Sequence, residues 1–256
     1  MLGTTIYPAS STPRFHIVLL HAFPLSSAMW ERMSAEFATL RDDAELIAID
    51  FPGFGKSQRQ EGWRMTDIAK QLHDEVVRKF DRAVICGLSM GGYAALEYYR
   101  QYPSTVQALV LSNTKAVEDT EAAKRAREIF AKDALVRGAD AAIERLYPGF
   151  VTERTDPQIA EQIREWMAAT NAEAIADALR AMAARRDSTD LLRLMTIPSL
   201  VISSSEDTVM PADGMRDMAV AMQDSYINID AAAHLSAVEG PKEWAKALSA
   251  FLDRIA

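Results

Sequence analysis

The chain has 256 residues, 49% of them hydrophobic, which suffices for one α/β domain with a single large core and a small inserted cap. Its 28 Lys and Arg against 36 Asp and Glu give a formal net charge of −8, which disfavours binding to nucleic acid or to an anionic membrane. Cys86 is the only cysteine, no secretory signal is recognised, and no stretch reaches the roughly 18 apolar residues of a membrane span, so we expect a cytoplasmic protein without disulfides.

Six short apolar runs along the chain are typical of buried strands. They cover residues 15–20, 46–49, 83–86, 108–111, 200–203 and 226–229. Segments with helical periodicity separate them: one carries Ile68, Leu72 and Val76 on a single stripe, and the last begins at Pro241. Continuous apolar strands that alternate with helices indicate an α/β fold with a mostly parallel, doubly wound sheet that is covered on both faces.

The loop at residues 50–57, DFPGFGKS, resembles a phosphate-binding loop only in part. A P-loop would need glycine at position 50, where Asp50 stands, and a dinucleotide fingerprint would need Gly or Ala at position 58, where Gln58 stands. We therefore interpret this loop as a turn with a structural Asp50. No cluster of His, Cys and Asp has the spacing of a metal site, so we expect neither a cofactor nor a catalytic metal.

Residues 82–97, DRAVICGLSMGGYAAL, contain the pattern G-x-S-x-G between a predicted strand and a predicted helix. A serine in such a sharp turn presents its hydroxyl above the sheet, and Gly87 and Gly91 remove Cβ atoms that would collide where strand and helix cross. This context predicts Ser89 as a nucleophile. Cys86, in the strand before it, is expected to be a small core residue rather than a reactive thiol.

Residues 115–186 interrupt the alternation, because they contain no credible strand. The predicted helices cover residues 122–133, 140–146, 157–170 and 172–186, with Asp156 and Asn171 as N-caps of the last two. Each helix has one apolar face, and we expect these faces to pack on one another and on the sheet, with a few side chains over the serine. The sequence thus predicts an α/β core at 1–114 and 187–256 with a helical cap at 115–186. The cations Lys124, Arg125 and Arg127 are interpreted as the solvated face of a cap helix rather than a site for an acidic substrate.

A serine hydroxyl needs a base, and the base needs an acid that orients it. Of the four histidines, His234 follows the last predicted strand and precedes the last helix, which is the place of the base when the chain order is Ser, acid, His. Asp207 lies in the segment SSSEDTVMP at the carboxyl end of the strand at 200–203 and is favoured as the acid over its neighbours Glu206 and Asp213.

Five motifs, taken together in this order, resemble the α/β-hydrolase fold superfamily. They are HAFP at 21–24, DFPGFGKS at 50–57, GLSMGG at 87–92, SEDTVMP at 205–211 and AHLSAVEGP at 233–241. Within the superfamily, GLSMGG, LVLSNT at 109–114 and AHLSAVE look most like the 3-oxoadipate enol-lactonase and small carboxylesterase branch. The resemblance implies an oxyanion hole made by the backbone N–H groups of Phe23 and Met90, although Ala22 stands where the family usually has glycine.

What the resemblance implies is a serine hydrolase that cleaves carboxylic esters or lactones through an acyl-enzyme, with a small-molecule substrate and a monomeric or homodimeric chain. The substrate pocket is expected to include His21, Trp30, Phe150 and Trp166. Two alternatives stay open: a C–C bond hydrolase of the same fold, and a ligand receptor with slow turnover. A serine nucleophile disfavours the dehalogenases of the superfamily, which carry aspartate at that position.

Overall fold

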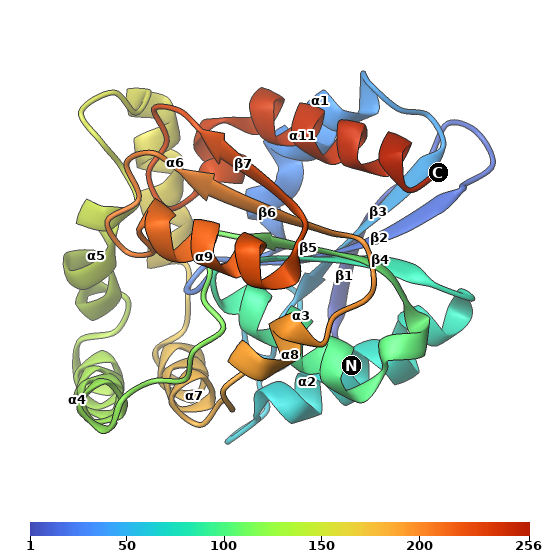
Figure 1. Cartoon of the computed structure of the whole chain (residues 1–256). Helices are drawn as coiled ribbons and strands as arrows, with labels where there is room; N and C mark the ends of the chain where they lie inside the picture. Colours follow the sequence, from blue (N-terminus) through green and yellow to red (C-terminus); the bar gives the residue numbers. More distant parts are fainter.

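A computed structural model describes all 256 residues, and one seven-stranded sheet organises them in the order β1-β3-β2-β4-β5-β6-β7 (Figure 1). The strands are β1 (Gly3–Tyr7), β2 (Phe15–Leu20), β3 (Ala44–Asp50), β4 (Ala83–Leu88), β5 (Val106–Ser112), β6 (Ser199–Ser204) and β7 (Ser225–Ile229). Every neighbouring pair is parallel except β1 with β3. The predicted mostly parallel sheet is therefore confirmed.

All six predicted strands are present, and β1 is an additional strand at the sheet edge. It runs antiparallel to β3, with Gly3 opposite Asp50 and Tyr7 opposite Leu46. Its sequence, GTTIY, is mostly half-buried. A short, partly polar edge strand lacks the continuous apolar run on which the other six predictions depended.

Eleven α-helices surround the sheet. They are α1 (Glu31–Ala38), α2 (Met65–Glu75), α3 (Met90–Gln101), α4 (Glu121–Arg137), α5 (Asp140–Leu146), α6 (Pro157–Ala168), α7 (Ala172–Ala183), α8 (Thr189–Arg193), α9 (Ala212–Met222), α10 (Ser236–Glu239) and α11 (Pro241–Arg254). In Figure 1, α1 and α11 lie on one face of the sheet, and α2, α3, α8 and α9 lie on the other. The predicted start of the last helix at Pro241 is confirmed.

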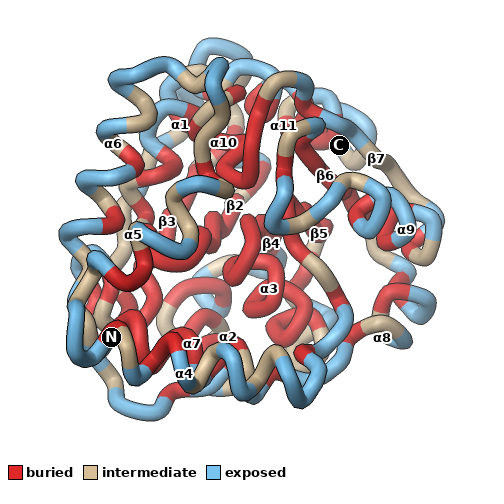
Figure 2. The backbone as a smooth tube through the Cα atoms, turned by 90° about the vertical axis from the view of Figure 1, so that its left-hand side faces the viewer, coloured by how far each residue is buried: buried red, intermediate tan, exposed pale blue.

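Alternate residues of one strand belong to different hydrophobic clusters. Ile17 and Leu19 of β2 pack with α1 and α11, whereas Val18 and Leu20 pack with α2 and α3. Since side chains alternate along a strand, both faces of the sheet are buried, as the continuous apolar runs predicted. The buried segments fill the centre of the molecule in Figure 2, and the exposed ones form its periphery.

Helices α4–α7 form one uninterrupted helical insertion between β5 and α8, which we call the insertion (residues 115–186). Its helices lie beyond the carboxyl ends of the parallel strands, toward which the arrowheads of β6 and β7 point in Figure 1. The predicted N-caps are present: Asp156 accepts from the amides of Gln158 and Ile159, and Asn171 from those of Glu173 and Ala174.

The two chain segments that connect the insertion to the rest of the molecule meet each other. The Ser188 N–H donates to the Ala116 carbonyl oxygen at 2.9 Å. Beside this bond, the buried Asp119 carboxylate receives Arg185 at 2.9 Å and Lys115 at 3.2 Å, and it also pairs with Arg127. Burial alone would raise the pKa of Asp119, but the hydrogen bonds from Arg185 and Arg127 hold this pKa well below its usual range.

No helix is both long enough and apolar enough to pass through a lipid bilayer.

Candidate active site

Ser89 occupies the turn between β4 and α3, in a backbone conformation that L-residues rarely adopt (φ 56°, ψ −114°). The flanking glycines make this turn possible. A Cβ at position 87 would lie 2.2 Å from the Gly91 carbonyl oxygen, and one at position 91 would lie 2.1 Å from the Leu20 carbonyl oxygen. A backbone hydrogen bond holds the strained turn, because the Ser89 N–H donates to the carbonyl oxygen of Ser112 in β5 at 2.9 Å.

The His234 imidazole lies between Ser89 and Asp207, and these are the three residues that the chain order predicted. His234 Nε2 lies 2.8 Å from Ser89 Oγ, and His234 Nδ1 lies 2.9 Å from Asp207 Oδ2. The three side chains come from the loops that follow β4, β6 and β7, and so they meet at the carboxyl edge of the sheet. Ser89 is 8% exposed and His234 is 1% exposed, so the hydrogen-bonded array lies in a largely water-excluded place.

The Asp207 carboxylate is fully supplied with donors. Its Oδ1 accepts from the amides of Val209 and Met210, both at 2.8 Å, while Oδ2 accepts from His234 and from Asn113 Nδ2. Burial raises the pKa of Asp207, but the hydrogen bond and charge of His234 and the other donors more than offset this, so that its pKa lies below the usual value. Asp207 is thus held as an anion beside the imidazole. The neighbours Glu206 and Asp213 make no bond to His234.

Asn113 is a site residue that the sequence analysis did not identify. It directly follows β5 with a left-handed backbone (φ 45°) and is fully buried. Its Nδ2 donates to Asp207 Oδ2 at 2.8 Å and to Ser204 Oγ at 2.5 Å, and its Oδ1 accepts from the hydroxyls of Ser112 and Ser236. The signal was present in the sequence, because an amide at the carboxyl end of a parallel strand lies where such sites form.

The two amides expected to bind an oxyanion lie on either side of the nucleophile turn. Met90 is the first residue of α3, so its N–H has no partner within the helix. Phe23 lies in the loop after β2, and its N–H donates to no protein acceptor. Neither amide is committed to an acceptor within the protein.

The insertion covers this site with aromatic side chains. Phe150 lies over the His234 ring, with ring centroids 5.4 Å apart and planes inclined by 19°. Phe130 of α4 packs edge-on against Phe23, with centroids 6.3 Å apart. Next to Phe23, the Thr170 hydroxyl donates to the Pro24 carbonyl oxygen at 2.7 Å. The insertion thus contacts both His234 and the loop that contains Phe23 and Pro24.

The other three expected pocket residues have different places. His21 accepts from the Phe51 N–H through Nε2 at 3.0 Å and faces the Ala22 carbonyl through Nδ1 at 2.9 Å, so both ring nitrogens bind backbone. Burial lowers the pKa of His21 to about 4, which keeps it neutral in this role. Trp30 is fully buried and packs edge-on against Trp244 in the core. Trp166 lies half-buried on α6, against the cluster that includes Phe150.

Asp50 has the structural place that its loop predicted. Its Oδ1 accepts from the Ser27 amide at 2.7 Å and its Oδ2 from the Lys56 amide at 2.8 Å. The remaining histidines, His16 and His73, stack on Phe80 and Tyr102 respectively. On α4, Lys124 pairs with Glu118 and Glu121 on the surface.

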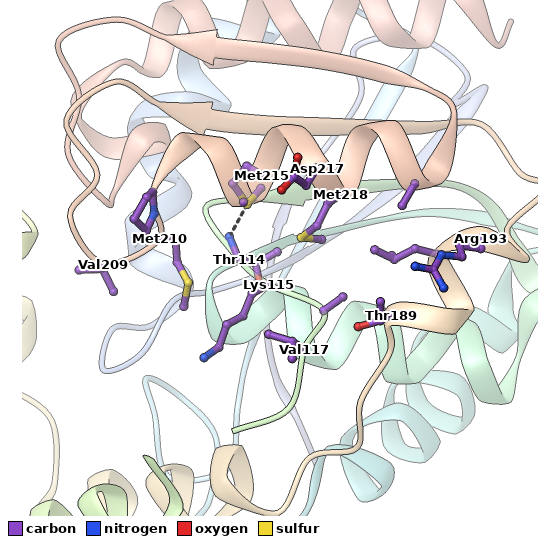
Figure 3. A pocket seen from close by; sticks show the side chains of 15 residues that line it. Thr114, Lys115, Val117, Thr189, Arg193, Val209, Met210, Met215, Asp217 and Met218 are labelled. Atoms are coloured by element: carbon purple, nitrogen blue, oxygen red, sulfur yellow. Dashed lines mark hydrogen bonds between the residues drawn. The ribbon is translucent and has the colours of Figure 1, made fainter. Parts of the chain in front are cut away.

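A partly apolar pocket lies beside the site rather than on it (Figure 3). It has a volume of about 550 Å³ and lies between α9, α8 and the segment that follows β5. Met215 and Met218 reach into it from α9, and the Met215 sulfur accepts from the Thr114 N–H at 3.2 Å. Neither Ser89 nor His234 lines it. We therefore place the site by the hydrogen-bonded array and not by this pocket.

No group of three or more His, Cys, Asp or Glu side chains lies close enough together to hold a metal ion.

The strained serine turn, the histidine and the buried aspartate thus meet at the carboxyl edge of a mostly parallel sheet. The family model for the alpha/beta hydrolase fold matches residues 16–241, so the chain belongs to the alpha/beta hydrolase family.

Esterases and lactonases are among the proteins of this family that the chain resembles. The chain is 26% identical to 3-oxoadipate enol-lactonase 2 of Acinetobacter baylyi, over 93% of this chain and 88% of that protein. A thermophilic esterase from Thermogutta terrifontis, with malate bound, superposes with a TM-score of 0.92 at 30% identity, over 99% of this chain and 94% of that one. An enol-lactonase from Burkholderia xenovorans shares the fold with a TM-score of 0.83 at 24% identity, over 98% and 96% of the two chains. The resemblance to the enol-lactonase and small carboxylesterase branch is confirmed, and the chain is a hydrolase of this fold.

Proposed function

We propose that this protein is a serine hydrolase that cleaves carboxylic esters or lactones through an acyl-enzyme. The observation that carries the proposal is the single imidazole between Ser89 Oγ and Asp207, with contacts of 2.8 and 2.9 Å. A base within hydrogen-bond reach of the hydroxyl, itself oriented by an acid, is the arrangement that activates a serine. The esterase and lactonase relatives support the choice of substrate class.

The chemistry follows from the placement of each group. Ser89 Oγ attacks the substrate carbonyl carbon while His234 Nε2 takes the hydroxyl proton. The Nδ1–H donated to Asp207 fixes the imidazole tautomer, and the carboxylate stabilises the imidazolium that forms. The N–H groups of Phe23 and Met90 bind the oxyanion, a contribution of roughly 3 to 4 kcal/mol per well-placed donor.

Attack of Ser89 gives a tetrahedral intermediate. Its collapse breaks the bond between the carbonyl carbon and the alkoxy oxygen, and this oxygen takes the proton from His234. A water molecule then gives a proton to His234 and attacks the acyl-enzyme. The second collapse releases a carboxylic acid and restores the serine; from a lactone, the whole product is a hydroxy acid. The insertion acts as a cap in this proposal, since Phe150 and Phe130 shield the imidazole and the Phe23 loop from water.

The test uses the wild type with Ser89→Ala, His234→Ala and the double variant, on a panel of p-nitrophenyl esters, simple lactones and enol-lactones. Each single variant should lose at least about 1000-fold in kcat, and the double variant should lose little more, because the residues act as one unit. Ser89→Ala with esterase rates close to wild type would overturn the proposal.

Burst kinetics with a chromogenic ester separates an enzyme from a receptor. An enzyme releases p-nitrophenol continuously after the first turnover, whereas a receptor with slow turnover releases about one equivalent and stops. We expect continuous release.

A further inference from the structure

Glu239 joins two parts of the molecule that are far apart in sequence. It is the last residue of α10, five residues after His234, and it is half-buried. Its Oε2 accepts from the Ala233 N–H at 2.8 Å, and its Oε1 accepts from the Thr155 hydroxyl at 2.7 Å. Ala233 directly precedes His234, while Thr155 belongs to the insertion.

We propose that Glu239 is a positioning residue that couples the placement of His234 to the closure of the insertion over the site. This inference rests on the proposed function, because it assigns to Glu239 an effect on the base of that reaction. Glu239 acts through the His234 loop and does not touch the reacting atoms.

The segment of the insertion that Glu239 holds is the one that covers the base. Thr155 accepts from the Thr152 amide at 2.7 Å, which closes a turn that begins directly after Phe150 and Val151. Phe150 stacks on the His234 ring. The bond to Thr155 therefore holds the Phe150 segment, and the bond to Ala233 holds the backbone of His234 itself. The Glu239 carboxyl group thus holds the backbone on both sides of the stacked Phe150 and His234 rings.

The other groups around this segment are already paired. Arg154, next to Thr155, forms an ion pair with Glu206, which precedes Asp207. Glu239 has no Lys, Arg or His partner, and the charged group that acts on it most is the Asp207 carboxylate. Burial, together with the charge of Asp207, raises the pKa of Glu239 to about 7, although the two hydrogen bonds act in the opposite direction.

Both hydrogen bonds can survive protonation of Glu239. In the neutral acid, Oε2 still accepts from the Ala233 N–H, and the new O–H on Oε1 donates to Thr155 Oγ1. Near neutral pH, the link thus persists while the negative charge beside the Asp207–His234 pair changes. Glutamine has the same shape as the neutral acid and can make the same two bonds, so Glu239→Gln keeps the link and removes only the titration.

Four variants separate these effects when kcat and KM for p-nitrophenyl acetate are measured across pH 5–9. Glu239→Ala removes both bonds and should lower kcat at least about 10-fold, because a displaced base is poorly aligned with the nucleophile. Glu239→Gln should keep kcat within about 3-fold. Thr155→Val breaks the bond between Glu239 and the insertion, together with the Thr152–Thr155 bond inside the insertion, and leaves the bond to Ala233 intact. It should raise KM several-fold with kcat nearly unchanged. Glu243→Ala is the control: it removes an exposed carboxylate four residues further along the chain that does not bond to the insertion or to the His234 loop, and it should match the wild type.

The pH profile provides a readout that a purely structural residue would not change. The wild-type profile should require an ionisation near pH 7 that Glu239→Gln lacks, with kcat rising as Glu239 ionises, because its charge favours the imidazolium formed in the transition state. If Glu239→Ala keeps the wild-type kcat while Ser89→Ala is inactive, the inference is overturned and the proposed function stands. An active Ser89→Ala would instead overturn the proposed function. Should Glu239→Ala fail to fold, by its melting temperature, then Glu239→Gln and Thr155→Val decide: both identical to wild type in pH profile and KM would refute the coupling.

Discussion

Asn113 shows how one amide can serve two parts of the site at once. It donates to the same Asp207 oxygen that receives His234, while its own oxygen accepts from two buried serine hydroxyls. Asparagine tolerates the left-handed backbone at this position better than most residues do. Asn113 therefore suits this position both by its backbone conformation and by the number of hydrogen bonds that its amide can form.

Replacing Asn113 by Leu should weaken activity and stability together. The change removes a donor from Asp207 and the shared acceptor of the Ser112 and Ser236 hydroxyls. These hydroxyls lie 3.1 Å apart, so one can then donate to the other, which keeps no side-chain acceptor. We expect a loss of about 1 to 3 kcal/mol in the free energy of unfolding, measured by urea denaturation, and a lower kcat for p-nitrophenyl acetate. Asn228→Leu on the edge strand β7 is the matched control and should leave kcat unchanged. An Asn113→Leu protein with wild-type kcat would show that Asp207 does not depend on this donor.

At this scale the sequence predicted the residues with a motif or a chain order, and these are the three that the structure joins by hydrogen bonds. Ser89 was predicted from the glycines of its motif, and His234 and Asp207 were predicted from their positions after strands. Asn113 and Glu239 belong to no such motif or chain order. Their roles depend on hydrogen-bond partners that only the folded chain brings together. His21 and Trp30 were expected in the pocket, but the backbone partners of His21 and the contact of Trp30 with Trp244 depend on packing that spacing does not encode.

Among the elements, the insertion depends on the buried Asp119 carboxylate at its base. Lys115 and Asp119 belong to the outgoing chain, Arg185 to the returning chain, and Arg127 to α4. The Arg185 guanidinium also lies over the Tyr93 ring of α3, 4.1 Å from its centroid. This group of charges therefore connects the insertion to the helices on the sheet.

Asp119→Ala should destabilise the protein strongly, because it leaves the Arg185 guanidinium buried without its acid. We expect a loss of about 3 to 5 kcal/mol in the free energy of unfolding. Asp190→Ala is the control, since Asp190 and Arg193 form an exposed pair that should contribute no more than about 1 kcal/mol. Urea denaturation at pH 7 measures both. Equal losses in the two variants would mean that burial of Asp119 has no special effect.

The Phe150 segment of the insertion can be tested by a change of one side chain. Phe150→Ala exposes the His234 ring to water and should change the ratio of kcat/KM between short and long p-nitrophenyl esters. Met167→Ala, a buried change on α6, should mainly cost the few kcal/mol of a core cavity with that ratio unchanged. A constant ratio in Phe150→Ala would place chain-length selection elsewhere.

The elements themselves could largely be predicted where their patterns were strong. In the insertion, α4, α6 and α7 each have a side-chain N-cap, and α5 has the predicted bounds of 140–146. The strand β1 could not be predicted because it is partly polar and lacks a continuous apolar run. The helix α8 has only five residues, too few to show a helical period. Helix α2 begins at Met65, where the Asp67 carboxylate accepts from the Arg64 amide at 2.8 Å.

For the whole molecule, two titratable groups make stability depend on pH in opposite directions. The pKa of His21 is about 4 instead of 6.5, so the unfolded chain binds more protons between these values and stability rises with pH. The pKa of Glu239 is about 7 instead of 4.5, so the folded chain binds more protons and stability falls as pH rises through this range. Each effect amounts to about 1.4 kcal/mol per pH unit where it acts alone.

These two slopes oppose each other between pH 4.5 and 6.5, where both groups act. We therefore expect a small net contribution from them in the wild type. Glu239→Gln removes one slope, so its free energy of unfolding should increase by about 2 to 3 kcal/mol more than that of the wild type between pH 4.5 and 6.5. Urea denaturation at the two pH values measures this, with Glu243→Gln as the control. Identical pH dependence in wild type and Glu239→Gln would contradict the raised pKa.

The hydrogen bond from Ser188 to Ala116 has a consequence for how such a molecule can change over evolutionary time. Since the chain departs and returns at neighbouring points, the helices between them can be lengthened, shortened or exchanged without moving any strand to a new place in the sheet. Substrate preference can then diversify in the exchanged segment, while the residues that perform the chemistry keep their positions.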